Sequence, residues 1–231
     1  MIGAVIDLLY PPLCLHCHGT LPSGKASFCN LCGESLEILE AESYCSRCFS
    51  PLDENSDCRE CFKRKVPFTA VTAVFSYSGI AGTLVQMMKY GKRPELSKGA
   101  AGYLTARFLE LGWPLPDMIV PVPIAWSHYL ERGYNQSALL AREFGKMINV
   151  PVVDLLIRSS GDFSQAGLRR HQREALRRES VELKSTESVR GACVLLIDDV
   201  MTTGTTLQRC GEALVRGSPS SLYAMTLCRS F

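Results

Sequence analysis

The sequence has few features of the protein classes that are easiest to recognise. Its 231 residues carry a formal net charge of only +2, which is too small to argue for nucleic-acid binding by itself. No apolar run approaches the ~20 residues that a membrane-spanning helix needs. The apolar stretch 1–14 contains Asp7 and has no early lysine or arginine, so it makes a poor signal peptide. These absences predict a cytoplasmic protein that does not insert into a membrane.

Two common nucleotide-binding motifs are also missing. No glycine is followed by Lys-Ser or Lys-Thr, which excludes a Walker loop, and the absence of Gly-x-Gly-x-x-Gly excludes the dinucleotide fingerprint. With 46% hydrophobic and 21% charged residues, the composition is that of an ordinary globular protein with enough apolar material for a sizeable core. The length allows one large domain, or a modest domain with a small appendage.

The cysteines are abundant and unevenly placed. Eight of the eleven form four Cys-x-x-Cys pairs before residue 62, a pattern that predicts metal binding rather than disulfides in a chain without an export signal. Two tetrahedral zinc sites use all eight thiolates, and sites made only of cysteine are expected to be structural. Pairing in sequence order needs the shortest loops and is favoured, although a crossed pairing is chemically equivalent. The predicted ligands are Cys14, Cys17, Cys29, Cys32, Cys45, Cys48, Cys58 and Cys61.

The sequence changes character near Pro67, which predicts a cysteine-rich zinc-binding region over 1–66 and a second domain over 67–231. In the second domain, apolar runs typical of strands alternate with helical spacing. This alternation predicts an α/β fold, with a mostly parallel sheet that carries helices on both faces. Ligands of such sheets bind beyond the carboxyl ends of the strands. The predicted strands are 71–77, 117–123, 150–157, 191–197 and 220–228; the predicted helices are 80–90, 99–112, 137–148 and 205–216.

The stretch VLLIDDVMTTGTTL, residues 194–207, carries the clearest chemical signal. A buried strand runs into Asp198 and Asp199, and a threonine-rich loop around Gly204 then enters a helix. Backbone amides at a helix N-terminus favour an anion, and Gly204 lets the backbone curl closely around it. Ionised carboxylates accept hydrogen bonds from vicinal hydroxyls. A phosphate site beside a diol site is what a ribose 5-phosphate group requires.

This stretch resembles the phosphoribosyl pyrophosphate (PRPP) signature of type I phosphoribosyltransferases. The N-terminal cysteines, FSYSG, Lys89-Tyr90-Gly91 and the segment 120–141 with Arg132-Gly133-Tyr134-Asn135-Gln136 further resemble the ComF/GntX branch, which is linked to competence and DNA uptake. The resemblance implies the type I phosphoribosyltransferase fold and binding of PRPP with Mg²⁺. It places PRPP on Asp198, Asp199, Val200, Met201, Thr202, Thr203, Gly204, Thr205 and Thr206.

Further residues are candidates on the same grounds. Lys89 and Arg132 are predicted to contact pyrophosphate, although Lys89 is equally explained as the cationic last turn of a helix. Gln165 and Arg173 match a flap over the site. The chain departs from the branch at Trp126-Ser127-His128, at Leu176 and at Val181, and these departures concern the acceptor side more than the PRPP side.

Two functions therefore stand beside each other. The first is a phosphoribosyltransferase-like protein that binds Mg–PRPP and transfers, or once transferred, phosphoribosyl to an unidentified acceptor. The alternative is a non-catalytic protein that handles single-stranded DNA with its zinc region and an arginine-rich segment at 158–178, in contact with DNA-uptake proteins. Whether the chain is an active enzyme, and whether it forms an oligomer, stay open at this point.

Overall fold

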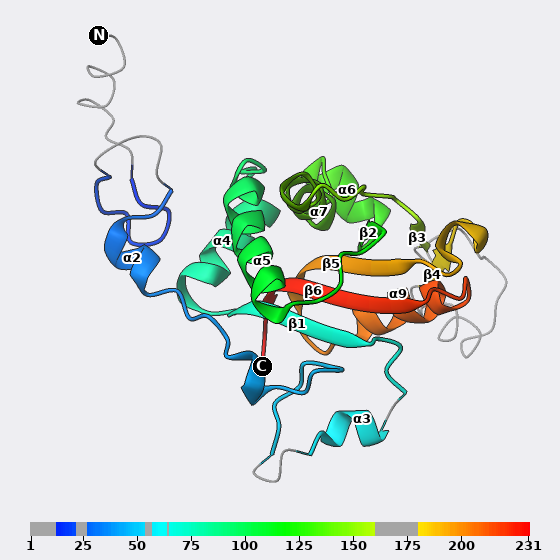
Figure 1. The fold of residues 1–231 in the computed structure, drawn as a ribbon. Coiled ribbons are helices and arrows are strands. Elements are labelled where there is room, and N and C mark those ends of the chain that lie inside the picture. Colours follow the sequence, from blue (N-terminus) through cyan, green and yellow to red (C-terminus); the bar gives the residue numbers. More distant parts are fainter. Residues whose placement is uncertain (1–12, 22–26, 54–56, 64, 160–179) are drawn as a thin grey trace, which may run out of the picture.

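A computed structural model describes residues 13–21, 27–53, 57–63, 65–159 and 180–231 (Figure 1). A four-stranded sheet with the order β1-β6-β5-β2 lies at the centre, and every neighbouring pair in it is parallel. The predicted α/β fold with a parallel sheet is confirmed. The strands are β1 (Ala70–Ser76), β2 (Met118–Pro121), β5 (Cys193–Met201) and β6 (Ser221–Arg229).

Helices cover both faces of this sheet (Figure 1). Three of them, α4 (Gly79–Lys89), α5 (Leu96–Leu111) and α7 (Gln136–Ile148), pack on one face, and α9 (Thr205–Val215) packs on the other. Successive side chains of a strand point to opposite faces. Accordingly, Leu195 lies in the core beneath the three helices, and its neighbour Leu196 lies in the core beneath α9. A strand buried on both faces explains the unbroken apolar run in the sequence.

The helix ends follow the local sequence. Asn135 is the N-cap of α7, and its side-chain oxygen accepts a hydrogen bond of 3.0 Å from the Ser137 amide. This cap satisfies an amide that has no partner inside the helix. At the other end Asn149 is left-handed with φ 57°, and Gly112 closes α5 with φ 60°. A further short helix that the sequence did not predict, α6 (Trp126–Arg132), follows β2.

One predicted strand is wrong. Residues 150–157 do not form a strand of the main sheet; Val152 makes only an isolated parallel bridge to Ile119 of β2. Pro151 has no amide to donate, and the Leu155 amide turns back to the Val153 carbonyl at 3.1 Å, so the chain leaves the edge of the sheet. It continues into β3 (Leu156–Ser159), which pairs antiparallel with β4 (Ser180–Leu183) in a separate two-stranded sheet.

The cysteine-rich region forms two separate modules. The first cysteine module (residues 13–21 and 27–34) includes α2 (Asn30–Glu34) and lies beside α4. The second cysteine module (residues 44–53 and 57–63) includes α3 (Arg59–Lys63) and follows the 3-10 helix η1 (Ala41–Ser43). Figure 1 shows the two modules at different places around the sheet. A second 3-10 helix, η2 (Glu187–Val189), precedes β5.

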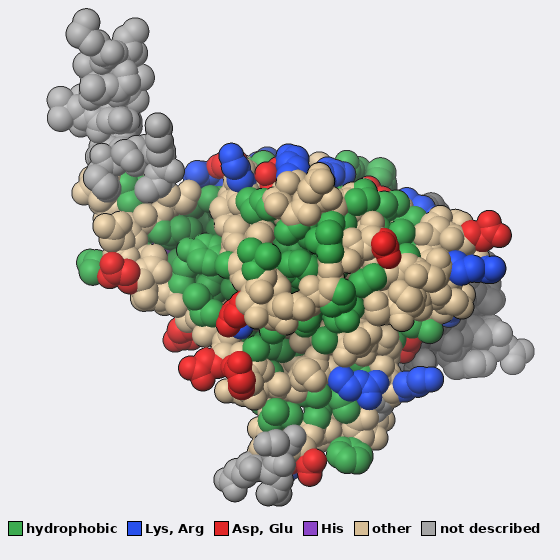
Figure 2. Space-filling model, viewed as in Figure 1, with side chains coloured by type: hydrophobic (Ala, Val, Ile, Leu, Met, Phe, Trp, Pro, Cys, Tyr) green, Lys and Arg blue, Asp and Glu red, His purple; other side chains and the backbone are tan. Residues whose placement is uncertain are grey.

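An apolar groove of about 840 Å³ is lined by residues of the first cysteine module, α4 and α5. Phe28 and Leu36 line one side, while Ile80, Leu84 and Tyr103 line the other. Figure 2 shows hydrophobic side chains gathered on this side of the molecule. Within the part of the chain that the structure describes, no helix is long and apolar enough to cross a membrane.

Candidate functional site

Two adjacent carboxylates lie inside β5, an inner strand of the sheet. The sequence predicts that this strand ends at Ile197, but it continues to Met201, so the predicted end is four residues too early. The extension follows from backbone pairing with β6, which persists up to the register of Met201 with Arg229. Asp198 and Asp199 are consequently held by a paired strand, and both are buried. The threonine-rich loop begins only after this strand.

Each carboxylate has a specific partner. The hydroxyl of Ser137, in the first turn of α7, donates to Asp198 Oδ1 at 2.7 Å, and the Asp199 amide donates to the same oxygen at 2.9 Å. Lys89 Nζ, at the end of α4, lies 3.0 Å from Asp199 Oδ1. Three elements that are distant in sequence therefore meet at the carboxyl end of β5. The Lys89 ammonium thus lies next to two neighbouring carboxylates.

The electrostatics of the pair follow from this arrangement. Burial and the neighbouring Asp199 carboxylate raise the pKa of Asp198 from 3.8 to about 7, against the opposing effect of the Ser137 hydrogen bond. Near neutral pH the Asp198 carboxyl therefore gains or loses a proton readily. A bound group that donates hydrogen bonds or brings positive charge favours the ionised form.

The raised pKa predicts a pH-dependent stability difference between the wild type and Asp198→Asn. The folded protein holds a proton on Asp198 that the unfolded chain has released, so the wild-type free energy of unfolding loses this contribution as pH rises from about 4 to about 7. Asparagine has no such proton. The free energy of unfolding of the variant, relative to wild type, should rise by about 1.4 kcal/mol per pH unit in that window. Urea unfolding of both proteins at pH 5–8 measures this, and a constant difference would contradict it.

A polar cavity of about 200 Å³ joins the predicted residues. Asp198, Asp199 and Thr206 lie on its walls together with Lys89 and Arg132, which the sequence assigned to pyrophosphate. The structure thus brings together candidates from three separate stretches of the chain. Val200, which the sequence assigned to PRPP, also lines the cavity. The remaining walls come from residues that the sequence did not assign to the PRPP site: Val122, Pro123, Ile124, His128, Asn135, Gln136, Ser137 and Arg158.

Arg132 sits at the end of α6 and is held by neutral groups. Its guanidinium donates to Gln136 Oε1 at 3.2 Å and to the Tyr90 hydroxyl at 3.3 Å, and it lies 4.9 Å from the centre of the Tyr90 ring. No carboxylate within the described residues forms a salt bridge with Arg132. Gln136 Nε2 is buried and lacks a hydrogen-bond partner among the described residues. Both groups can therefore serve a ligand oxygen in the cavity.

The loop between β5 and α9 has the geometry of an anion site. Gly204 is the N-cap of α9 in the left-handed conformation, with φ 74°. The Thr203 and Thr205 hydroxyls are 2.8 Å apart, and the Thr205 amide donates to Thr203 Oγ1 at 3.3 Å. Thr202, Thr203 and Thr205 are exposed, so the start of α9 is open to an anion from solution. Met201 differs, because its side chain is buried in the core beneath α9.

The predicted flap residues Gln165 and Arg173 lie outside the described residues, as does Leu176. Val181 lies in β4 and is buried in the core beneath α9. His128, one of the positions at which the sequence departs from the branch, is half-exposed on α6 with its ring 3.5 Å from Glu131.

The eight paired cysteines form two compact tetrads. Within each tetrad the four sulfur atoms lie within 4.8 Å of one another, which suits four thiolates around one tetrahedral ion. The predicted pairing in sequence order is confirmed, and neither tetrad includes His16 or His18. The tetrads are Cys14, Cys17, Cys29 and Cys32, and Cys45, Cys48, Cys58 and Cys61.

The two tetrads are built on the same turn. The His18 amide donates to the Cys14 carbonyl at 3.0 Å, and the Phe49 amide donates to the Cys45 carbonyl at 2.8 Å. His18 and Phe49 are both left-handed, with φ 60° and 55°. In each module this turn lies at the first Cys-x-x-Cys pair of the tetrad. Of the other cysteines, Cys210 and Cys228 are buried in the core, whereas Cys193 is half-buried.

Comparison with known proteins agrees with both sites. The family model described as a phosphoribosyl transferase domain matches residues 107–230, which is more than half of the chain. The chain belongs to the phosphoribosyltransferase family. A model described as a double zinc ribbon domain matches residues 5–62, and with the two tetrads it supports two zinc sites in this phosphoribosyltransferase homologue.

The resemblance to the ComF branch is also confirmed. The DNA utilization protein YhgH of Salmonella typhi is 27% identical to this phosphoribosyltransferase homologue, over 96% of this chain and 99% of that protein. Competence protein F of Haemophilus influenzae is 26% identical over 94% of this chain and 96% of its own length. Competence protein ComFC of Bacillus subtilis is 23% identical over 87% and 84%.

The donor set around β5 also fits the cation that phosphoribosyltransferases use. Mg²⁺ prefers oxygen ligands and keeps several of its waters, so it binds through one or two carboxylates and the phosphates of the substrate. Asp198 and Asp199 supply carboxylate oxygens at the cavity, next to Lys89. These residues fit a magnesium ion that arrives bound to an anionic ligand.

Proposed function

We propose that this protein binds Mg–PRPP in the cavity at the end of β5 and transfers the phosphoribosyl group to an acceptor. The observation that carries the proposal is the convergence of Asp198, Asp199, Lys89 and Arg132 on one polar cavity beside the start of α9. PRPP needs hydroxyl acceptors, a monophosphate site and a cationic pyrophosphate site close together. The walls of this cavity and the adjoining loop offer all three.

The ribose would be held by the two carboxylates, because ionised carboxylates accept hydrogen bonds from vicinal hydroxyls. The 5-phosphate would bind the loop 202–206, where backbone amides at the N-terminus of α9 and the threonine hydroxyls donate. The Lys89 ammonium contacts Asp199 and lines the same cavity. A ligand with both hydroxyls and phosphate oxygens matches such a pair of opposite charges.

In the transfer, the bond between C1 of ribose and pyrophosphate breaks and negative charge grows on the leaving group. Lys89 and Arg132 would stabilise that charge, since both line the cavity. Mg²⁺ would add a Lewis acid at the pyrophosphate oxygens. The rest of the rate enhancement would come from holding the acceptor and C1 in line. Gln165 and Arg173 stay the candidates for a flap.

The proposed domain boundaries stay 1–66 and 67–231.

Thermal unfolding tests the binding step. Mg–PRPP at about a hundred times its Kd should stabilise the folded protein by about 2.7 kcal/mol and raise the Tm of the C-terminal transition by about 5–11 °C. Ribose 5-phosphate and Mg–pyrophosphate, each of which fills only part of the cavity, should give smaller shifts at the same concentration. An unchanged Tm at saturating Mg–PRPP, or an equal shift with Mg²⁺ alone, would contradict the proposal.

A second candidate function comes from the relatives, whose names are DNA utilization protein and competence protein. We infer a cellular role in DNA uptake, with single-stranded DNA as the alternative ligand. Binding to a single strand should weaken with salt by ~0.7 logarithmic units per decade for each phosphate contacted. A salt-independent association, or none at physiological salt, would leave PRPP as the sole ligand of this proposal.

A further inference from the structure

We propose that the second cysteine module positions the phosphate-binding loop, so that zinc on the second tetrad sets the affinity of the site while zinc on the first tetrad does not. The inference rests on the proposed function, because the loop 202–206 is the proposed site of the PRPP 5-phosphate. It goes further by giving the two zinc sites different roles.

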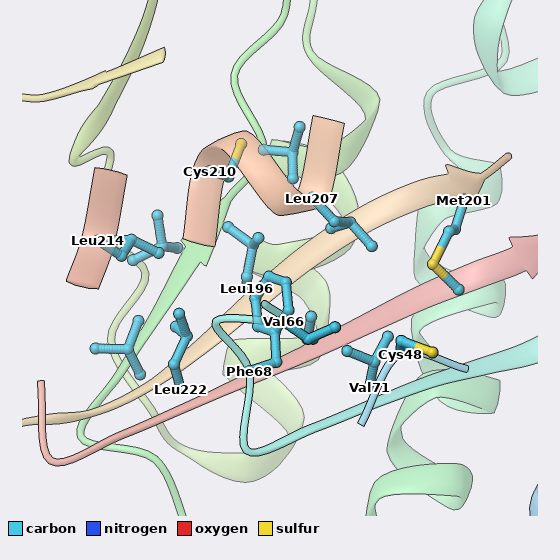
Figure 3. Packing of buried hydrophobic residues seen from close by; sticks show 14 of the residues in the cluster. Cys48, Val66, Phe68, Val71, Leu196, Met201, Leu207, Cys210, Leu214 and Leu222 are labelled. Atoms are coloured by element: carbon cyan, nitrogen blue, oxygen red, sulfur yellow. The ribbon is translucent and has the colours of Figure 1, made fainter. Parts of the chain in front are cut away.

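The second tetrad is packed directly behind the loop. Cys48 and Gly204 line the same cavity, whose volume of about 10 Å³ has room for about one water at most, so the metal site lies close to the glycine at the start of α9. Figure 3 shows Cys48 beside Val71, with Met201 lying nearby at the end of β5. Cys45, Cys48 and Phe49 belong to the same core cluster as Met201 and Leu207, which flank the loop on both sides.

The segment that leaves the second module is also fixed to α9. Gln208 Nε2, in the first turn of α9, donates to the Lys65 carbonyl at 2.8 Å. Gly211, one turn later, lies so close that a Cβ atom there would be 2.6 Å from Pro67 and 2.8 Å from the Phe68 ring. This close approach requires glycine at position 211. The start of α9 thus cannot move independently of residues 65–68.

The other side of the loop faces the second module across a polar cavity of about 620 Å³. Thr203 and Arg229 line it together with residues 50–53 and with Arg59, Glu60 and Lys63. The Arg229 guanidinium donates to the Thr202 carbonyl, and it lies 5.6 Å from the ring of Phe231. Phe231 in turn stacks on Tyr44 of the module at 5.3 Å. The module therefore contacts the loop through two routes.

The first cysteine module provides a contrast. Its cysteines Cys14 and Cys32 pack with Leu21 and Ile80, at the start of α4, and His16 Nδ1 lies 2.9 Å from Thr83 Oγ1. None of the residues of the loop 202–206 belongs to this cluster. The two tetrads have the same chemistry and the same turn geometry. Within the described residues, however, the packing that leads to the loop starts from the second module, and hydrogen bonds of Lys65 and Arg229 reinforce it.

Loss of zinc from the second tetrad should therefore loosen the loop 202–206. The Cys48 and Cys58 sulfurs, from the two halves of the module, lie 3.3 Å apart. Without a metal ion, no bond other than the backbone joins these two halves. The wall behind Gly204 then loosens, and the loop spends less time in the conformation that binds phosphate. The apparent Kd equals the intrinsic Kd divided by the fraction of competent loops. A loop competent for a tenth of the time binds about tenfold more weakly.

The test compares Cys58→Ser with Cys29→Ser, since both cysteines are half-buried members of their tetrads. Each variant should lose about one zinc ion by elemental analysis. Amide hydrogen exchange of 202–208 should accelerate at least tenfold in Cys58→Ser and stay at the wild-type rate in Cys29→Ser. The Kd for Mg–PRPP should rise at least tenfold only in Cys58→Ser. Cys58→His, which keeps a zinc ligand, should restore both values.

Exchange of the amides in 195–197 monitors the fold, because these residues are fully buried in the sheet. Unchanged protection there, with faster exchange in the loop, supports positioning rather than unfolding. Equal loop exchange in Cys58→Ser and Cys29→Ser overturns the inference, whether or not PRPP binds. If the wild type does not bind Mg–PRPP, the proposed function fails, and the loop exchange, which needs no ligand, still decides the coupling.

Discussion

Replacing Asp198 and Asp199 together with asparagine is expected to weaken binding of Mg–PRPP by about a hundredfold to ten-thousandfold. Hydrogen bonds to charged groups contribute about 1.5–3 kcal/mol each, and the double variant removes both carboxylate charges that would receive the ribose hydroxyls. Asparagine keeps the size of each side chain and the oxygen that accepts from Ser137. The loss should appear in the Kd, measured by calorimetric titration, and not in the fold.

Asp117→Asn is the matched control for this double variant. Asp117 is also bonded to β5, but at the amino end of the strand, where its Oδ2 accepts from the Cys193 amide at 2.7 Å. The control should bind Mg–PRPP as the wild type does. The Tm of the unliganded double variant should equal or exceed that of the wild type, because the repulsion between two buried carboxylates is gone. Equal affinities of the double variant and the control would refute the assignment of the carboxylates.

Removing zinc is expected to have the largest effect on the fold itself. We expect about two zinc ions per chain in the purified protein, from two tetrads of four thiolates. The modules have little regular structure, since α2 and α3 are each only 5 residues long. A structural zinc ion contributes ~10–16 kcal/mol to the folding of a peptide of this kind. A strong chelator should therefore unfold both modules.

Limited proteolysis with mass spectrometry measures this outcome. After chelation, new cleavage sites should appear between residues 13 and 63, while β5 and β6 stay protected because each is buried on both faces. Addition of zinc should restore the original pattern. A folded, reduced preparation with a metal content near zero, or equal protease resistance with and without chelator, would contradict the zinc assignment.

Local patterns account for the parts of the structure that the sequence predicts well. The run from Val194 to Ile197 is apolar because both faces of β5 are covered, and Asn135 caps α7 through its own neighbouring residues. The tetrads follow from the Cys-x-x-Cys spacing, because each pair supplies two of the four ligands of one site and a short loop brings two pairs together. Each of these features depends on residues that are near one another in the chain.

Features that depend on distant residues were not predictable in the same way. The polarity of Asp198 suggests the end of a strand, yet pairing with β6 carries the strand on to Met201. The contact of Lys89 with Asp199 joins residues 110 positions apart, and Ser137 reaches Asp198 across 61 positions. The bend after Val152, where pairing with β2 ends, likewise depends on contacts with residues distant in sequence. Only tertiary packing sets these contacts.

The packing of the second cysteine module against α9 belongs to the same class. Composition separates 1–66 from the rest of the chain, but the core beneath α9 includes Cys45 and Phe49 together with Leu207 and Leu214. The pattern of cysteines gives no sign that one tetrad lies behind the loop and the other does not. The structure therefore adds a physical link between metal binding and the candidate site.

A calorimetric titration of the zinc-loaded wild type with PRPP, in the presence and absence of Mg²⁺, tests the central claim most directly. The account predicts saturable binding of one PRPP per chain with Mg²⁺, and much weaker binding when the cation is removed. If neither Mg–PRPP nor ribose 5-phosphate gives a saturable heat of binding at the same concentrations, the account is contradicted. The cavity at the end of β5 would then not be a PRPP site.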